Sequence, residues 1–416
     1  MKREKNNSIT NQNSIGEKKI YSKSDRAITL IALIVTIIVL LILAGVTINV
    51  VVGKGGVINK SKFAVNKYKK SEDEEVESIK DLENVIGNYI DVKSGEYASY
   101  TTKYSDGTSV ATIPAGFTVS GISSENKISS GLVIYKGDLS KADWSTGKDA
   151  SKKDIKRTYN QYVWIPCTEE EYKRRKWSVE EDGSPAYNDE TNLKNIGTLS
   201  DYDQKNGITI KILQEIVDQI TKEKASVKKY GGFYIGRYEV GADNAICQYK
   251  YPSASLIWSA AYANAKKINV GSASVSYLSS SYAIDTALNF IQTNSEFKTY
   301  ALTRDKGSNG TDINENWQDK SVKYTDANGD LQTKAAETAT MLPTGVTTAK
   351  CNIYDMGGNV AEYTTELNPT EGNNDATVVL RGGTYNNNSN AAGNRWDDGS
   401  AYYDSTRGFR ATLFIQ

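Results

Sequence analysis

The sequence predicts an α+β head domain carried by an N-terminal transmembrane helix and a helical stalk. First, residues 28–52 contain no charged side chain. Second, apolar residues recur at helical spacing through residues 57–90. Third, from about Glu96 onward, short β-rich runs punctuated by glycine are mixed with two helical stretches. We therefore divide the chain into a basic leader (1–27), a transmembrane helix (28–52), a stalk helix with a linker (53–95) and a head (96–416).

Composition removes several classes of function. The 416 residues include 50 basic and 50 acidic side chains, without the excess positive charge of a nucleic-acid-binding surface, so we expect no nucleic acid partner. Histidine is absent, which excludes Ser-His-Asp triads, Cys-His dyads and histidine-ligated zinc or iron. Cys167, Cys247 and Cys351 form no CxxC pair and lie beside apolar residues. We expect these three side chains to be buried as small hydrophobic groups.

The apolar segment 28–52 is long enough to cross a bilayer, because a helix of this length extends about 37 Å. A cleaved secretory signal would have an apolar region only about half as long. The preceding segment is basic, which by the positive-inside rule keeps it in the cytoplasm; its basic residues are Lys2, Arg3, Lys5, Lys18, Lys19, Lys23 and Arg26. We therefore expect a single-pass protein of the cell membrane with its C-terminal head outside the cell.

The junction "SDRAITLIALIVTIIVLLILAGV" resembles the N-terminus of bacterial type IV prepilins and pseudopilins. The resemblance implies that a prepilin peptidase cuts between Ala27 and Ile28, and that other pilin-like subunits are partners. The family's glycine before the cut is Ala27 here, and its glutamate at the fifth mature position is Ala32. These departures favour a minor or tip subunit of a surface pilus-like structure, or a plain membrane tether, over a subunit of the pilus body.

Residues 57–90 are predicted to form an amphipathic helix with a charged face opposite an apolar one. Its apolar positions are Val65, Tyr68, Val76, Ile79, Leu82, Val85 and Ile86. The helix is either a stalk that holds the head away from the membrane or an ordinary solvated surface helix. In both interpretations it acts as a spacer.

Within the head, four runs have the β-branched and aromatic residues typical of strands: "ATIPAGFTVS", "GLVIYKG", "QYVWIPC" and "GGFYIGRYEVG". Two further stretches have apolar residues at helical spacing: "SLIWSAAYANAKKI" and "SSYAIDTALNFIQT". A long polar segment, residues 303–340, separates them from the C-terminal part. We therefore expect one α+β domain without an internal repeat.

Four motifs occur in the head in this order: "GGFYIGRYEVG", "CNIYDMGGNVAEYTTE", "VVLRGGTYNNN" and "GFRATLF". Together they resemble the formylglycine-generating enzyme or sulfatase-modifying-factor family. The resemblance implies a C-type-lectin-like α+β fold whose ordered loops are held by buried polar contacts and often by calcium. In such a framework we expect Arg381 and Arg410 to make buried charge-assisted contacts.

The family's oxidase binds copper with two cysteines just before its Gly-Phe-Arg strand. This chain has "NRWDDGSAYYDSTR" at that place, without a cysteine. A related branch holds iron with histidines, which are absent here. Because a fold carries no activity without its site, we expect a protein that is not an enzyme and requires no cofactor. The alternative is a divergent oxidase that depends on Cys247 or Cys351.

A calcium site is a second implication of the family resemblance. In the family a Gly-Asn-Val-x-Glu turn supplies carbonyls and a carboxylate to the ion. The matching residues are Gly358, Asn359, Val360 and Glu362, and calcium prefers such oxygen ligands. The alternative is that Asn359 and Glu362 only satisfy backbone amides of the loop. The sequence leaves both interpretations open.

Residues 384–407, between the Arg-Gly-Gly and Gly-Phe-Arg motifs, are predicted to form a surface loop. They are rich in Asn, Tyr, Ser, Asp and Gly and contain little aliphatic side chain. The pattern resembles the variable region of diversity-generating retroelement target proteins, in which asparagine codons receive adenine-directed mutations. The alternative is a polar surface loop from an AT-rich genome, where such residues are frequent everywhere.

This loop supplies the candidate ligand-binding residues. Tyrosine and tryptophan offer contact area at low entropic cost, and asparagine and aspartate add adaptable hydrogen bonds. The candidates are Tyr385, Asn386, Asn388, Asn394, Trp396, Asp397, Asp398, Tyr402, Tyr403 and Asp404. We expect them to bind an extracellular protein or glycan. A minor pilin whose head initiates or caps a filament is the alternative function.

Overall fold

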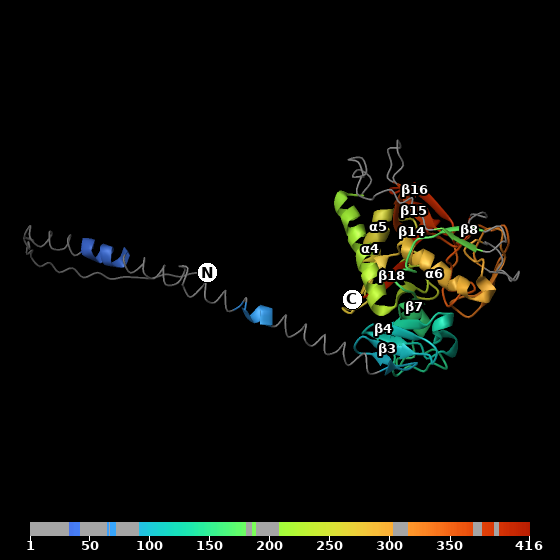
Figure 1. Cartoon of the computed structure of the whole chain (residues 1–416), viewed down its shortest axis with the longest axis horizontal. Coiled ribbons are helices and arrows are strands. Elements are labelled where there is room, and N and C mark those ends of the chain that lie inside the picture. Colours follow the sequence, from blue (N-terminus) through green and yellow to red (C-terminus); the bar gives the residue numbers. More distant parts are fainter. Residues whose placement is uncertain are drawn as a thin grey trace, which may run out of the picture. The chain divides into compact units, whose positions relative to one another are not determined.

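A computed structural model describes residues 33–41, 65, 67–71, 91–179, 185–188, 208–302, 315–368, 377–386 and 391–416. The chain divides into two compact units, Met1–Lys80 and Asp81–Gln416, drawn in Figure 1. In the first unit, residues 33–41 are helical and their apolar side chains are exposed. Among the helices that the structure describes, none has the length and apolarity needed to cross a membrane. The leader, the Ala27–Ile28 junction and most of segments 28–52 and 53–90 lie outside the described residues.

The second unit, the head, is a mixed α+β domain, as predicted. Its largest element is a seven-stranded sheet in the order β11-β18-β10-β7-β6-β5-β2, with antiparallel pairing throughout. The C-terminal strand therefore lies inside the sheet, between two other strands. The bounds are β11 Ser274–Leu278, β18 Ala411–Ile415, β10 Gly232–Gly236, β7 Gln161–Pro166, β6 Val133–Lys136, β5 Phe117–Val119 and β2 Tyr97–Ala98.

A second, four-stranded sheet has the order β16-β15-β14-β17. Its strands are β16 Arg395–Gly399, β15 Thr377–Arg381, β14 Ala361–Asn368 and β17 Arg407–Phe409. Only the β14–β17 pair is parallel. Three small sheets complete the strands: β1 Asp91–Val92 with β3 Thr102–Ser105 and β4 Val110–Ile113; β8 Lys176–Val179 with β9 Pro185–Asn188; and β12 Val322–Thr325 with β13 Leu331–Lys334.

The two predicted helices are confirmed as α5 (Trp258–Ala265) and α6 (Ser281–Thr293). The sequence reasoning missed the longest helix of the head, α4 (Ile210–Tyr230), which packs on β10 and β18. Its ends carried a readable signal, because the side chain of Thr209 caps the first turn and Gly231 ends the helix with φ +79°. The short helices are α3 Ile155–Thr158, η1 Ser123–Glu125, η2 Ile128–Ser130 and η5 Ser295–Phe297.

The core lies on both faces of the seven-stranded sheet. In β7, Tyr162 and Trp164 belong to one buried cluster, whereas Val163 and Ile165 belong to the other. Successive side chains of a strand point to opposite faces, so a strand covered on both sides has a continuous apolar sequence. This explains the uninterrupted run "YVWI".

The three cysteines are buried, as predicted from their apolar neighbours, and none is in a disulfide. Burial raises the pKa of the Cys167, Cys247 and Cys351 thiols to about 12. Since the thiolate is the reactive form of cysteine, these thiols are poor nucleophiles at neutral pH.

One acid of α4 is buried without a cationic partner among the described residues. The carboxylate of Glu223 accepts hydrogen bonds from Tyr172 (2.7 Å), Ser280 (2.8 Å) and Gln219 (2.7 Å). Burial nevertheless raises the pKa of Glu223 to about 7, despite the opposing effect of these hydrogen bonds.

We therefore predict that Glu223 makes the protein less stable as the pH rises from about 4.5 to about 7. The folded state holds the proton more tightly than the unfolded state, so the contribution present at low pH is lost through this window. The loss is about 3 kcal/mol at 1.36 kcal/mol per pKa unit. Urea unfolding at several pH values should show that Glu223→Gln removes this part of the slope. Glu170→Gln, at an exposed position, is the control, and an equal slope in wild type and Glu223→Gln would contradict the prediction.

Candidate ligand-binding face

The prediction that residues 384–407 are all loop is wrong at Arg395–Gly399, which form the edge strand β16. β16 pairs antiparallel with β15, and Trp396 lies opposite Leu380. Trp396 also packs against the buried cluster that contains Leu380. The strand is polar apart from Trp396, so it lacks the alternation of apolar residues by which a strand is predicted from sequence.

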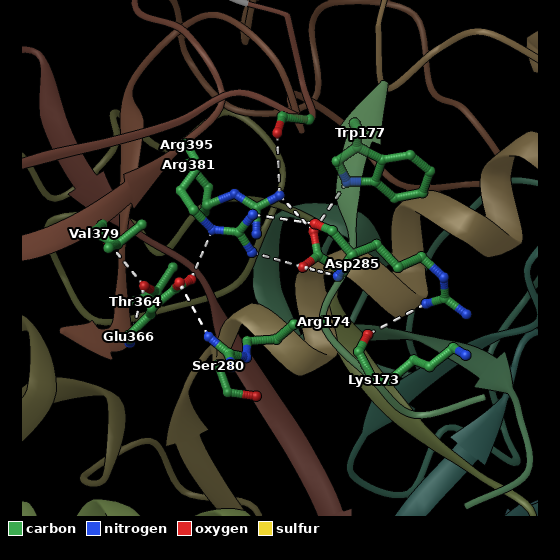
Figure 2. A network of polar contacts seen from close by, with 12 residues as sticks. Lys173, Arg174, Trp177, Ser280, Asp285, Thr364, Glu366, Val379, Arg381 and Arg395 are labelled. Atoms are coloured by element: carbon green, nitrogen blue, oxygen red, sulfur yellow. Dashed lines mark hydrogen bonds and ion pairs between the residues drawn. The ribbon is translucent and has the colours of Figure 1, made fainter. Parts of the chain in front are cut away.

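A buried ion-pair network lies beneath this sheet and centres on Asp285 of α6 (Figure 2). The Asp285 carboxylate pairs with Arg381 of β15 at 2.5 Å and with Arg395 of β16 at 2.9 Å. It also accepts hydrogen bonds from the indole of Trp177 (3.0 Å) and from the backbone of Arg175 (2.9 Å). These contacts tie two neighbouring strands to one helix.

The network continues to β14 through Glu366. Its carboxylate pairs with Arg395 at 2.9 Å and with Arg174 at 3.3 Å. Burial alone would raise the pKa of Asp285, but the guanidinium groups of Arg381 and Arg395 outweigh it and hold that pKa below its usual value. The predicted buried contact of Arg381 is therefore confirmed, and the carboxylate at the centre of the network is ionised.

Arg410 makes the second predicted buried contact, with Glu362 of β14 at 2.6 Å. Its guanidinium also donates to the carbonyls of Gly236 (2.9 Å) and Tyr354 (2.7 Å). These hydrogen bonds of Arg410 hold the C-terminal Gly-Phe-Arg motif against β10 and against the segment before the Gly-Asn-Val turn.

The four candidate calcium ligands lie in one turn, but the protein itself engages their side chains. The Asn359 side-chain oxygen accepts from the Asn316 amide and from the backbone of Leu342, each at 3.0 Å. Glu362 is the partner of Arg410, whose positive charge opposes a cation at that place. Gly358 has φ +84° and Val360 donates its backbone N–H to Glu239. Among the described residues no three acidic or cysteine side chains converge on a metal position.

This arrangement engages the side-chain oxygen of Asn359 and Oε1 of Glu362 with donors of the protein rather than with a calcium ion. It fits the other interpretation that the sequence left open, a turn whose polar groups satisfy one another. Calcium binding at Gly358, Asn359, Val360 and Glu362 stays a prediction that binding measurements have to test.

Arg407 of β17 organises the outer part of the site. Its guanidinium lies over the ring of Tyr402, 4.0 Å from the centroid, and over that of Trp396 at 5.6 Å. It pairs with Asp398 of β16 and lies 3.5 Å from Asp404. The Arg407 guanidinium therefore connects four of the predicted ligand-binding residues: Trp396, Asp398, Tyr402 and Asp404.

The side chains of two consecutive tyrosines, Tyr402 and Tyr403, are exposed to solvent. Tyr402 is 54% exposed and Tyr403 is 65% exposed, although the backbone of Tyr402 is held by a 2.9 Å hydrogen bond from the hydroxyl of Tyr363. Tyr385 lies nearby, since its hydroxyl is 2.7 Å from the hydroxyl of Ser405. Asn386 is exposed as well. Their side chains can therefore meet another molecule without rearrangement of the backbone.

The remaining predicted residues are placed less favourably or not described. Asn394 is partly buried, and its backbone oxygen accepts from Arg381 at 3.1 Å. The Asp404 carboxylate accepts from the backbone of Thr406 at 2.7 Å and is only partly available. Asn388 and the side chain of Asp397 lie outside the described residues.

We define the candidate ligand-binding face as the four predicted residues that Arg407 contacts, Trp396, Asp398, Tyr402 and Asp404, together with Tyr385 beside Ser405 and the exposed Asn386 and Tyr403. Sequence reasoning missed the residues that position this face, above all Arg407, Asp285 and Tyr363. Asp285 lies within a helix predicted from apolar periodicity, and nothing in the local sequence links it to β15 or β16. An arginine among Tyr, Trp and Asp was the only available signal for Arg407.

Comparisons with known proteins give distant similarities only. No protein-family profile matches the sequence, and no curated protein matches it. Among solved structures, CarF is 15% identical, covers 44% of this chain and 87% of its own, and has a TM-score of 0.30. The Major Tropism Determinant P3c variant is 16% identical over 45% of this chain and 52% of its own, with a TM-score of 0.27. Variable protein 1 of Treponema denticola is 13% identical over 76% of this chain and 99% of its own, with a TM-score of 0.24.

We predict that Asp285→Ala lowers the free energy of unfolding by about 3–5 kcal/mol, because it leaves the buried Arg381 without its ion-pair partner. Chemical denaturation measures this change. The control is Asp243→Ala, which removes an exposed pair with Lys250 and should cost no more than about 1 kcal/mol. Equal losses in the two variants would show that the buried network does not support the sheet.

Proposed function

We propose that the head binds an extracellular protein or glycan through the candidate ligand-binding face, without catalysing a reaction on it. The observation that carries this proposal is the pair of exposed tyrosines, Tyr402 and Tyr403, in the segment between β16 and β17, two strands that ion pairs hold in place. Aromatic side chains on a fixed support are typical anchors of binding surfaces.

The physical reason for expecting binding here is that the side chains are already held in position in the free protein. Ordering a side chain on binding costs free energy, so a ring that is already held in the free protein loses less. The guanidinium of Arg407 stacks on Tyr402, and the hydroxyl of Tyr363 holds the Tyr402 backbone. Asp398 and Asp404 pair with the same Arg407 and add polar groups beside the ring of Tyr402, which suits the polar and hydrated surfaces of proteins and glycans.

The buried thiols favour binding over the alternative of a divergent oxidase. Burial raises the pKa of Cys247 and Cys351 to about 12, so neither presents a free thiolate as a nucleophile at neutral pH. Both side chains lie in the core rather than on the candidate face.

We also propose that the head is displayed on the cell surface. The uncharged segment 28–52 would anchor the protein, with the basic leader inside the cell and the head outside. The alternative of a minor pilin rests on the prepilin-like junction at Ala27 and Ile28, and it assigns the head a structural role in a filament. The two functions differ in whether altering the candidate ligand-binding face alone has an effect.

We predict that the double variant Tyr402→Ala, Tyr403→Ala weakens binding at least about tenfold, because truncating central aromatic anchors costs 2 kcal/mol or more. The labelled protein is applied to printed arrays of glycans and cell-surface proteins. Val110→Ala is the control, at a site that is 58% exposed on the β3–β4 hairpin, far from β16 (Figure 1). Undiminished binding by the double variant would refute the assignment of this face.

We also propose that the codons of residues 384–407 are diversified by a retroelement. Most of these residues can arise from asparagine codons by changes at adenine, whereas Trp396 cannot and is expected to stay constant. Deep sequencing of a clonal culture and of sibling isolates should show substitutions at adenines between the codons for Gly383 and Gly408, with unchanged flanks. A stretch as constant as its flanks would contradict diversification and leave a fixed binding site.

A further inference from the structure

A groove lies between α4 and the C-terminal strand β18 and shares no residue with the candidate ligand-binding face. It encloses about 220 Å³. One wall is the α4 surface at Ala225 and Ser226, and the other comes from the ends of β11 and β18. The Ser226 hydroxyl donates to the carbonyl of Ile415 at 2.8 Å, which holds the helix and the strand together along the groove.

The sequence of α4 explains why this space stays open. Ala225 and Ser226 lie three and four residues after Lys222, and Lys229 lies four and three residues after them, so all four share one face of the helix. The two central residues have short side chains. Their size leaves the neighbouring strands uncovered between the two lysines, which are separated by two helical turns or about 10 Å.

The floor of the groove is apolar. Val275 and Tyr277 of β11 and Phe414 of β18 line it. These three side chains belong to the buried core or pack against it, and Phe414 stacks on Phe233 beneath the groove with ring centroids 5.4 Å apart. The floor is therefore rigid and offers no side-chain charge to a ligand.

The rim is positively charged. Lys222 and Lys229 are exposed, and neither forms an ion pair with any residue that the structure describes. The ammonium of Lys229 lies 4.8 Å from the ring centroid of Tyr230. Glu223, next to Lys222 in sequence, turns inward to Tyr172 and Ser280 and does not neutralise the rim.

Tyr230 and Gln416 complete the lining and are hydrogen-bonded to each other. An apolar floor of this size with two lysines at its rim suits a small molecule that is apolar at one end and anionic at the other. We propose that the groove binds a free anionic amphiphile, a carboxylate with an acyl or aryl tail of about eight carbons. An apolar cavity of about 150 Å³ accommodates benzene, so the tail has room here. The carboxylate would lie at Lys222 or Lys229, where it remains partly hydrated, and the tail would lie against Ala225, Val275 and the accessible edge of Tyr277.

The test is equilibrium dialysis of radiolabelled octanoate against the full chain in lipid nanodiscs, with empty nanodiscs measuring partition into lipid. Ala225→Leu fills the groove from an exposed helix position that tolerates leucine. It should weaken protein-bound octanoate at least about tenfold, because each buried methylene contributes about fourfold in affinity. The double variant Lys222→Gln, Lys229→Gln should weaken it several-fold, whereas Lys228→Gln on the same helix should not.

Octylammonium, which has the same tail and the opposite charge, should not displace octanoate. The proposal is overturned if Ala225→Leu binds octanoate like wild type, if octylammonium competes equally, or if octanoate is found only in the lipid. Circular dichroism of each variant confirms that α4 is intact. None of these outcomes depends on the candidate ligand-binding face, so the groove and the proposed function stand or fall separately.

Discussion

The ion pairs of Asp285 with Arg381 and Arg395 are the constraint on which the outer part of the head depends. A single carboxylate on α6 holds the end of β15 and the start of β16 in register. Removing such charges from water is costly, and their mutual attraction offsets the cost only when the geometry is good and the remaining polar atoms are bonded. Here Trp177, Arg175 and Glu366 supply the additional contacts. The arrangement thus favours one position of the strands over many.

That support explains how a polar, glycine-containing segment can present a defined surface. A free loop of this composition would have to be ordered by its ligand, at a cost in affinity. In the head, the stretch from Arg395 to Gly399 is a strand, and Arg407 links it to Tyr402 through stacking and to Asp398 through an ion pair. Substitution of Asn386 or Tyr403, whose exposed side chains take no part in these contacts, would leave this support in place.

The two proposed sites would bind their ligands through different kinds of interaction. The candidate ligand-binding face is built from polar and aromatic groups over buried charge, and its selectivity would come from hydrogen bonds and ring contacts. The groove beside α4 has an apolar floor and lysines at its rim. Burial of an apolar tail would therefore supply the affinity, and the lysines would favour an anionic head group. The groove exists because two short residues stand where longer ones would close the helix onto β18.

The sequence by itself determined the α+β class of the head, the burial of the cysteines and the buried contacts of Arg381 and Arg410. These features depend on local composition, on periodicity and on motifs that are continuous in sequence. Tertiary structure alone decided that β16 is a strand, that Asp285 joins it to β15, and that Arg407 gathers Trp396, Tyr402 and Asp398. These contacts join residues far apart in the chain or depend on strand pairing, and their free energy exists only after the backbone has brought the partners together. The polar turn at Asn359 shows the same limit, because its oxygens suit a cation until folding places Arg410 against Glu362.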